Sequence, residues 1–575
     1  MEKIEKKIDL WLEDNYDLAT KIEITRLQKD DPQQLSDAFY RNLEFGTGGL
    51  RGVMGVGTNR MNQYTVGAAT QGLANYLIQQ FDQEEIRVAI AYDSRNNSRF
   101  FADIAADVLS ANGIQCFLFS ALRSTPELSF TVRKYLCHSG IVITASHNPK
   151  EYNGYKVYWQ DGGQLLPPHD KNVIKEVEKI SKLNQVHRNR NSELVTMIGK
   201  ETDEQYIENI LELTLHPEAL NAKNNISIVY SPLHGTGGVI IPDVLKRSGF
   251  HHVAVVEEQV EPDGNFPTTP YPNPEERSTL QLALEKADKI NADIVMATDP
   301  DADRVGVAVR NNDGEMVLLN GNSVAALLTY YILSEKKRNH ELTGNEFVVK
   351  TIVTTELISD IALDFNVGCE DVLTGFKYIA GKIAEYEGKK QFLCGGEESY
   401  GFLIGDSVRD KDANVTCCLF AEMTAMLRTE GKTVVDLLHQ LYRDYGYYYE
   451  EQVSITKKGA SGAVEIRKMM QTFRENPPKM IASSQVTKFL DYKQQICIDT
   501  IADKTIKISL PSSDVLQFYT EDGTIITVRP SGTEPKIKFY FSVKEKVKGS
   551  ETIEEVERLL KTRTEKYIDH LLTSK

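Results

Sequence analysis

The chain has 575 residues, of which 41% are hydrophobic, and it carries a formal net charge of -16 with a pI near 5.3. This length exceeds what one hydrophobic core organises and predicts roughly three to five domains. The acidic balance argues against nucleic acid and anionic membranes as partners, because both select basic surfaces. An anionic ligand must therefore be held by local clusters of Arg, Lys and backbone N–H groups, since charges beyond about 8 Å are screened.

The cysteines and the N-terminus indicate the compartment. The N-terminal residues are strongly charged, and no apolar run approaches the roughly 18 residues that span a bilayer, so we expect neither an export signal nor a membrane anchor. No C-x-x-C pair occurs, and most cysteines lie in apolar stretches typical of reduced core residues. These are Cys116, Cys137, Cys369, Cys394, Cys417, Cys418 and Cys497. We therefore expect a cytoplasmic protein.

The chain begins with residues at helical spacing, which predict helices ahead of the first sheet: Ile4, Ile8, Trp11 and Leu12. A glycine-rich stretch follows at residues 45–52, FGTGGLRG, where the backbone can turn tightly and approach a ligand. It is not a dinucleotide fingerprint, because Arg51 stands where the third glycine belongs, and it lacks the Gly-Lys-Ser/Thr of a P-loop. Taken alone, it is as typical of a structural turn as of a binding loop.

Strands and helices then alternate. We expect a helix at about 67–80, a strand at 87–92, a helix at 101–112 and a strand at 116–120. Such alternation is typical of a parallel or mixed sheet with crossover helices.

A buried strand at 140–143 opens into the sequence TASHNPKEYNGYK at residues 144–156. Ser146 lies where the strand ends, a place where α/β folds hold reactive groups, and Asn153-Gly154 predicts a turn behind it. His147, Lys150 and Lys156 follow closely, and two cations beside a hydroxyl suit phosphate better than acyl chemistry. The alternative is an N-capped turn in which Ser146 bonds only to the backbone.

The next informative loop follows a strand at 294–297 and reads TDPDADR at residues 298–304. Asp299, Asp301 and Asp303 alternate along it, and three converging carboxylates are costly unless a hard cation such as Mg²⁺ lies between them. The loop is not an EF-hand, because Arg304 stands where that motif needs glycine. A solvated acidic turn is the alternative.

Two later loops carry charged and polar side chains, and Glu397 and Ser399 in the second of them offer acceptors and a donor suited to vicinal hydroxyls. LTGFKY at 373–378 places Lys377 at a helix start, and GGEESYG at 395–401 follows a strand. In the last part of the chain, VRPSGTEPK at 528–536 combines an arginine, hydroxyls and glycine-freed N–H groups, which make a phosphate cradle. Individually these loops are also compatible with an exposed helix lysine, a charged turn and an ordinary hairpin.

In this order the loops resemble those of the α-D-phosphohexomutases, the phosphoglucomutase and phosphomannomutase superfamily. The resemblance extends from residue 46 to residue 536. It implies that Ser146 carries a phosphoryl group and, with Asp299, Asp301 and Asp303, binds Mg²⁺. The remaining roles that it implies are catalysis by Lys156, Lys377, His147, Arg51 and Arg304, sugar binding by Glu397 and Ser399, and phosphate binding by Arg529, Ser531, Gly532 and Thr533.

The fold implied by the resemblance is α/β: three similar α/β domains with mixed sheets and a smaller α+β C-terminal domain around a central cleft. Domain I, 1–205, carries N-terminal helices and the phosphoserine loop, and domain II, 206–318, carries the metal loop. Domain III, 319–448, carries the sugar loop, and domain IV, 449–575, carries the phosphate loop.

The implied reaction interconverts glucose 1-phosphate and glucose 6-phosphate through a phosphoserine enzyme and glucose 1,6-bisphosphate, which also serves as activator. Lys156 and Lys377 are the candidates for general acid and base, because desolvation beside other cations would lower a lysine pKa. Glu398 favours glucose over mannose by comparison with the family. A phosphopentomutase, a phosphomannomutase or a non-catalytic sugar-phosphate sensor are the alternatives.

Overall fold

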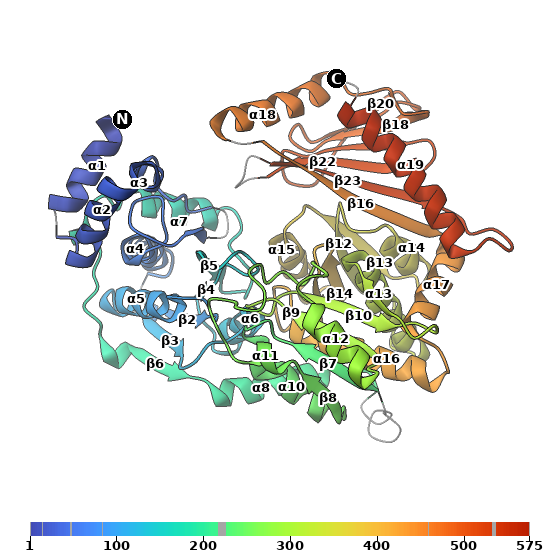
Figure 1. Ribbon diagram of the computed structural model, residues 1–575, viewed down its shortest axis with the longest axis horizontal. Coiled ribbons are helices and arrows are strands. Elements are labelled where there is room, and N and C mark those ends of the chain that lie inside the picture. The colour runs from blue at the N-terminus through green and yellow to red at the C-terminus, as the bar shows by residue number, and fades with distance from the viewer. Residues whose placement is uncertain are drawn as a thin grey trace. The chain divides into compact units, whose positions relative to one another are not determined.

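The computed structural model describes residues 2–13, 15–46, 49–82, 84–216, 226–457, 459–531 and 536–573 (Figure 1). The chain forms two compact units. The first comprises Met1–Gly321 and Ile379–Gly431, and the second comprises Asn322–Tyr378 and Lys432–Lys575. The predicted third domain, 319–448, thus contributes to both units, and the four predicted domain ranges stay predictions.

The first unit begins with three helices that share a small apolar core around Trp11 and Phe39: α1 (Glu2–Glu13), α2 (Leu18–Asp30) and α3 (Pro32–Phe39). Two of them start with side-chain caps, because Asp17 accepts from the N–H of Thr20 and Asp31 accepts from that of Gln34. The helices expected ahead of the first sheet are therefore present.

The first sheet has six strands in the order β1 (Gly49–Val53), β5 (Tyr152–Trp159), β4 (Ser139–Ile143), β2 (Arg87–Tyr92), β3 (Gln115–Phe119) and β6 (Val195–Ile198). Its centre is parallel and its β1–β5–β4 side is antiparallel, so the sheet is mixed, as predicted. The helices of this part of the chain are α4 (Gln63–Gln80), α5 (Ser98–Ala111), α6 (Thr125–Lys134), α7 (His169–Glu178) and α8 (Lys200–Glu212). Every residue of β4 is buried, which places the end of β4 and Ser146 in the interior.

The expected turn at Asn153-Gly154 is wrong, because both residues belong to β5. A side chain at residue 154 would place its Cβ 2.3 Å from the carbonyl oxygen of Thr144. Glycine is therefore required there by the close approach of the serine loop to the strand.

The second sheet, also in the first unit, has the order β11 (Met316–Leu319), β10 (Val305–Arg310), β9 (Ile294–Thr298), β7 (Ser227–Ser231) and β8 (His252–Val255). Strand β7 pairs in parallel with β8 and β9, while β9–β10 and β10–β11 are antiparallel. Residues 311–315 connect the antiparallel strands β10 and β11. This unit also contains α10 (Gly237–Arg247), α11 (Glu257–Val260), α12 (Gln281–Ile290), α16 (Ala413–Thr429) and the antiparallel pair β14 (Gln391–Glu397) and β15 (Gly401–Ile404).

The second unit contains a parallel pair and an antiparallel sheet. The pair is β12 (Glu346–Thr351) and β13 (Gly368–Val372), accompanied by α13 (Gly321–Arg338), α14 (Leu357–Asp364) and α17 (Val434–Tyr445), and α15 (Phe376–Tyr386) starts here. The sheet has the order β16 (Tyr447–Thr456), β23 (Lys536–Glu545), β22 (Ile525–Pro530), β21 (Leu516–Thr520), β18 (Ser484–Asp491), β19 (Ile496–Asp499) and β20 (Lys504–Lys507), with β17 (Met480–Ile481) beside β18. Helices α18 (Gly459–Glu475) and α19 (Ile553–Thr573) pack on this sheet (Figure 1), which is the predicted α+β arrangement.

Candidate active site

The predicted nucleophile lies in the loop between β4 and β5. Ser146 is 3% exposed and has φ of 51°, a left-handed conformation that is uncommon for residues other than glycine. Its Oγ donates a hydrogen bond to Asp299 Oδ2 at 2.6 Å, and His147 Nδ1 lies 3.1 Å from the same Oγ. The serine loop and the aspartate loop, predicted from separate motifs, therefore meet at one buried point.

The three aspartates follow β9 in the loop that leads to β10. Asp299, Asp301 and Asp303 are 0 to 2% exposed, and their ligand oxygens lie within 4.8 Å of one another. Asp299 Oδ1 accepts the backbone N–H groups of residues 303 and 304, at 3.1 and 3.0 Å, which fixes the curve of the loop. Thr125 Oγ1 donates to Asp301 Oδ2 at 2.8 Å. The loop thus holds its carboxylates in a set geometry.

These residues fit a bound cation. Asp301 Oδ1 and Asp303 Oδ1 are buried and have no hydrogen-bond partner in the part of the chain that the structure describes. Burial and the charges of Asp301 and Asp303 raise the pKa of Asp299 well above its ordinary value. Because such crowding is costly without compensation, the donor set suits a hard metal ion that prefers carboxylate oxygens.

Two buried lysines supply part of the compensation. Lys156 Nζ lies 2.7 Å from Asp301 Oδ2 and 3.3 Å from Asp303 Oδ2, and Lys411 Nζ lies 3.3 Å from Asp303 Oδ2. Burial acts to lower the pKa of Lys156, but the Asp301 and Asp303 carboxylates outweigh it and raise the pKa. The expectation that desolvation would lower this pKa is therefore wrong, because the nearest charges are anions and the ammonium keeps its proton.

His147 and the two predicted arginines surround the same loop. Burial, then the positive charges of Arg304 and Arg51, lower the pKa of His147 well below its ordinary value, so the imidazole is neutral at pH 7. The single hydroxyl proton of Ser146 goes to Asp299, so His147 Nδ1 must be the donor to Oγ. Arg51 Nη1 donates to Asn148 Oδ1 at 3.2 Å, and Arg304 Nη1 donates to Glu275 Oε1 at 2.8 Å.

The predicted sugar loop, 395–401, comprises the end of β14, the turn that follows it and the first residue of β15, so Glu397 is the last residue of a strand. Glu397 is buried, Ser399 is partly buried, and the carbonyl oxygen of Tyr400 accepts the N–H of Val305 at 3.1 Å. The Glu397 carboxylate also acts on Lys411. Burial acts to lower the pKa of Lys411, but the charges of Asp303, Asp410 and Glu397 outweigh it and raise the pKa. Thus the loop that carries Glu397 and Ser399 lies beside the aspartates.

The other predicted residues belong to the second unit. Lys377 lies in the first turn of α15, with Nζ 5.2 Å from the centre of the Tyr378 ring. Arg529 stands near the end of β22, opposite Lys538 of β23, and the N–H of Ser531 donates to the carbonyl oxygen of Lys536 at 2.7 Å. Gly532 and Thr533 lie outside the described residues. The assignment of these residues to the same active site stays a prediction.

Sequence reasoning missed several residues of this site, because no local motif marks them. Lys411 is one of them, and its Nζ lies 3.2 Å from Asp410 Oδ1. Asp410 Oδ2 in turn accepts hydrogen bonds from the Tyr158 hydroxyl at 2.6 Å and from Gln164 Nε2 at 2.8 Å. A Cβ at Gly401 would lie 2.0 Å from the Lys411 side chain, so only glycine at this position of the GGEESYG stretch leaves room for that side chain. Arg95, directly after β2, is another, and it binds the serine loop.

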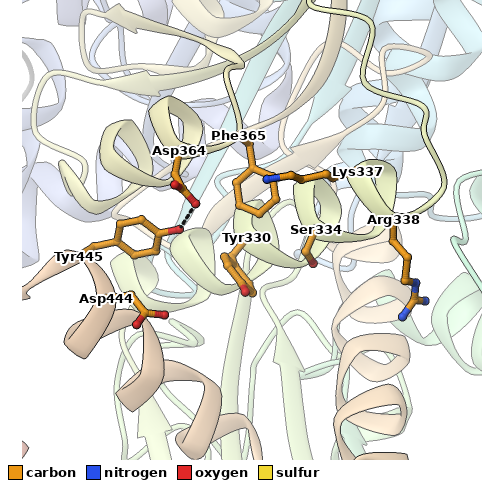
Figure 2. Close-up of a pocket in the computed structure, with 8 residues that line it drawn as sticks. All are labelled: Tyr330, Ser334, Lys337, Arg338, Asp364, Phe365, Asp444 and Tyr445. Atoms are coloured by element: carbon orange, nitrogen blue, oxygen red, sulfur yellow. Dashed lines mark hydrogen bonds between the residues drawn. The ribbon is translucent and has the colours of Figure 1, made fainter.

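A cavity in the second unit is separate from these residues. Its volume is about 580 Å³, and it lies where α13, α14 and α17 end (Figure 2). Figure 2 shows the Tyr445 hydroxyl pointing to Asp364 and the Lys337 amine beside the Phe365 ring. The Tyr445 hydroxyl donates to Asp364 Oδ2 at 2.9 Å, and Lys337 Nζ lies 4.8 Å from the centre of the Phe365 ring. None of the predicted site residues that the structure describes lines this cavity, so it is not the predicted active site.

The chain matches four domain families in succession. They are described as phosphoglucomutase/phosphomannomutase alpha/beta/alpha domain I at residues 42–184, domain II at 204–314, domain III at 320–445, and the C-terminal domain at 475–559. Together the matches cover most of the chain. The chain therefore belongs to the phosphoglucomutase/phosphomannomutase family, as the sequence motifs predicted.

Individual relatives agree. A phosphoglucomutase of Staphylococcus haemolyticus is 38% identical over 88% of this chain and 91% of its own, and one of Staphylococcus aureus is 36% identical over 93% and 95%. The structure of a putative phosphomannomutase from Thermus thermophilus covers 92% of this chain and 99% of its own with a TM-score of 0.67 and 20% identity, which shows a shared fold. The chain is accordingly an intramolecular phosphotransferase. No helix among the described residues has the length and hydropathy needed to cross a membrane.

Proposed function

We propose that this enzyme is a phosphoglucomutase that interconverts glucose 1-phosphate and glucose 6-phosphate through a phosphorylated Ser146. The 2.6 Å contact between Ser146 Oγ and Asp299, inside a group of three buried carboxylates, carries the proposal. It supports a serine oxygen that exchanges a phosphoryl group beside a metal ion. The two relatives named phosphoglucomutase, at 36 and 38% identity, support glucose phosphates as substrates.

The phosphoryl group moves twice in each turnover. In the first half-reaction, the bond between Ser146 Oγ and phosphorus breaks as a sugar hydroxyl oxygen bonds to phosphorus; the sugar hydroxyl loses its proton to a base, and the departing serine oxygen takes one up. The product is glucose 1,6-bisphosphate, which turns end for end. In the second half-reaction, Ser146 Oγ bonds to the opposite phosphorus as the bond between that phosphorus and its sugar oxygen breaks; the serine hydroxyl loses its proton and the sugar oxygen takes one up, which leaves a sugar monophosphate. The chain must therefore present the same oxygen as leaving group and as nucleophile.

The charged residues have distinct parts in this scheme. Lys156 remains protonated between Asp301 and Asp303, which suits it to offset the charge on the departing serine oxygen rather than to remove a proton. Lys377 is then the candidate base at the sugar hydroxyl. The neutral His147 orients Ser146 Oγ through Nδ1. Glu397 and Ser399 would bind sugar hydroxyls, and the loop from Arg529 to Thr533 would hold the phosphate that is not reacting.

Asp299, Asp301, Asp303 and the seryl phosphate would hold Mg²⁺, and when bound this ion neutralises charge on the transferring phosphoryl group. The two unpartnered carboxylate oxygens support this assignment. Glucose 1,6-bisphosphate would act as activator by phosphorylating Ser146. We place the enzyme in the cytoplasm, where the thiols of its seven cysteines would stay reduced.

Replacement of the serine tests the proposal. The wild-type enzyme is assayed with Mg²⁺ and glucose 1,6-bisphosphate on glucose 1-phosphate, mannose 1-phosphate and ribose 1-phosphate, and kcat/KM should be highest for glucose 1-phosphate. Ser146→Ala should lower kcat on that substrate by at least about a thousandfold, because the oxygen that carries the phosphoryl group is gone.

Intact mass provides the second readout. Incubation with glucose 1,6-bisphosphate should add one phosphoryl group to the wild type and none to Ser146→Ala. Ser110→Ala on α5, a buried serine away from the loop, is the matched control and should behave as the wild type does. Near-normal turnover in Ser146→Ala would remove the serine from the mechanism.

A further inference from the structure

The side chain of Arg95 binds several carbonyl groups of the serine loop. Its Nη2 donates to the carbonyl oxygens of Ser146 and Asn148, and its Nη1 donates to those of Pro149 and Tyr152, the latter two at 2.8 and 3.1 Å. A single planar guanidinium therefore binds four carbonyl oxygens between residues 146 and 152. These carbonyls cover the whole loop from the nucleophile to the start of β5.

Arg95 is itself held in place from several sides. Its N–H donates to Asp93 Oδ1 at 2.9 Å, its Nε lies 3.4 Å from Asp93 Oδ2, and Ser98 Oγ donates to Asp93 Oδ1 at 2.7 Å. The guanidinium lies 5.0 Å from the centre of the Phe266 ring. Both members of the Asp93–Arg95 pair have fully buried side chains. The clamp is therefore rigid and shielded from water.

Two other arginines of the same unit show what a purely structural arginine does here. Arg123 donates from Nε and Nη2 to the two carboxylate oxygens of Asp203, both at 2.7 Å. Arg99 donates from Nε and Nη2 to the carboxylate of Asp103. Arg95 differs because both of its terminal nitrogens go to loop carbonyls, and only Nε faces its carboxylate. Carbonyl oxygens offset a buried charge less well than a carboxylate does. The partners of Arg95 therefore fix the conformation of the loop, although a carboxylate would stabilise the buried guanidinium more.

The loop needs such a clamp because of its conformation. Ser146 lies in the left-handed region, which is unfavourable for a residue with a Cβ. This conformation persists only where neighbouring groups fix it. The carbonyl of Ser146 itself accepts from Arg95, so the clamp acts on the residue whose Oγ reaches Asp299.

We propose that Arg95 is a positioning residue that sets the direction of Ser146 Oγ toward the aspartate loop in both half-reactions. It touches neither substrate nor the reacting atoms; it acts through the backbone of residues 146–152. The inference rests on the proposed role of Ser146 as nucleophile. Because both half-reactions use the same oxygen, loosening of the loop should slow both without weakening the capture of the sugar phosphate.

Arg95→Lys tests this, because lysine keeps the charge but cannot bind four carbonyls from two nitrogens. We expect kcat to fall by about 10- to 100-fold, since small displacements of a reacting group cost rate steeply, while KM for glucose 1-phosphate stays within about threefold. The single-turnover rate of Ser146 phosphorylation by glucose 1,6-bisphosphate, followed by intact mass, should fall in parallel. Arg99→Lys is the matched control and should change kcat less than about twofold.

Amide hydrogen exchange of the peptide covering residues 144–152 gives a readout that does not depend on activity. Exchange should speed up in Arg95→Lys and not in Arg99→Lys. If Arg95→Lys does not fold, Asp93→Asn releases the clamp more gently and should lower kcat with KM kept. An unchanged kcat, a raised KM at normal kcat, or a lowered kcat with unchanged exchange in the loop would each overturn the proposal. A wild type without mutase activity would instead count against the proposed function, and loop exchange would still test the clamp.

Discussion

Two buried lysine clusters, one in each unit, use the same kinds of residues in different ways. In the first unit, Lys156 and Lys411 pair with Asp301, Asp303 and Asp410. Each of these three aspartates is at most 2% exposed. In the second unit, Lys350 is fully buried and pairs with Glu356 at 2.7 Å and Asp371 at 2.8 Å, whose side chains are 30% and 51% exposed. The anions are enclosed in the first cluster and reach solvent in the second.

The difference shows what separates a reactive site from a structural ion pair. In the first cluster two buried carboxylate oxygens have no hydrogen bond among the described residues, whereas Lys350, Glu356 and Asp371 have no buried side-chain atom that lacks one. Solvent can satisfy the spare oxygens of Glu356 and Asp371, but it cannot reach those of Asp301 and Asp303. Spare acceptors among three converging carboxylates, and not the lysines, therefore mark the place where a cation belongs.

The largest expected effect comes from Asp301→Asn. Loss of one carboxylate from the group should weaken Mg²⁺ binding by at least about 100-fold and lower kcat by roughly a thousandfold. The rise in melting temperature that Mg²⁺ gives the wild type should also disappear. Calorimetric titration with Mg²⁺ and thermal unfolding with and without the ion measure both.

Asp371→Asn is the matched control, since it removes one carboxylate from the second cluster. It should leave Mg²⁺ affinity and kcat within about twofold of the wild type, because exposed partners contribute little. Equal losses of Mg²⁺ affinity in both variants would contradict the distinction between the clusters.

Lys350→Met should give the next largest effect, on stability instead of catalysis. The substitution leaves two carboxylates without their buried cation, and we expect the free energy of unfolding to fall by about 2 to 3 kcal/mol, less than for a fully enclosed pair because both carboxylates keep some solvent. Urea unfolding measures the loss. The folded variant should retain kcat within about twofold, because the ion-pair partners of Lys350, Glu356 and Asp371, are not predicted site residues.

Lys468→Met, on the exposed side of α18 in the same unit, is the control and should change stability by less than about 0.5 kcal/mol. If Lys350→Met kept full stability but lost activity, Lys350 would belong to the site and the comparison would fail.

Much of this site follows from the sequence, because each motif sits where a buried strand ends. The strands predicted before Ser146 and Asp299 are β4 and β9, both fully buried, and the aspartates form the compact group that alternate spacing suggested. The family resemblance supplied the expectation that these two loops meet. The structure shows the contact between Ser146 and Asp299 directly.

The rest of the site depends on contacts between distant segments, which local patterns do not record. Lys411 and Arg95 are unremarkable in sequence, and their roles arise because β15 and β2 bring them to the aspartate and serine loops. Asn153-Gly154 resembled a turn, but the approach of Thr144 to the strand explains the glycine. The Lys156 pKa was predicted in the wrong direction because the nearest charges, Asp301 and Asp303, lie far away in sequence.

Glu450→Gln should give the smallest effect and a distinctive pH dependence. Glu450 lies near the second cluster, and its Oε1 is buried without a hydrogen-bond partner among the described residues. Burial raises the pKa of Glu450 to about 7, while hydrogen bonds from Thr355 and Asn322 and the charge of Lys350 act against the shift. The folded wild type therefore binds more protons than the unfolded chain between the ordinary glutamate pKa of about 4.5 and the folded value.

Stability contributed by this group is thus present at low pH and is lost as pH rises through that window. Glutamine cannot ionise, so the unfolding free energy of Glu450→Gln relative to the wild type should rise by about 1 to 3 kcal/mol from about pH 5 to about pH 8. Urea unfolding at several pH values measures the difference. Glu545→Gln is the control, because the hydrogen bond from Arg563 lowers the pKa of Glu545 in the folded protein. The stability that the Glu545 carboxylate contributes is lost only below about pH 5. The difference in unfolding free energy between Glu545→Gln and the wild type should therefore be constant from about pH 5 to about pH 8. A pH-independent difference for Glu450→Gln would show that its carboxyl is solvated, and that the second cluster lacks an enclosed acceptor entirely.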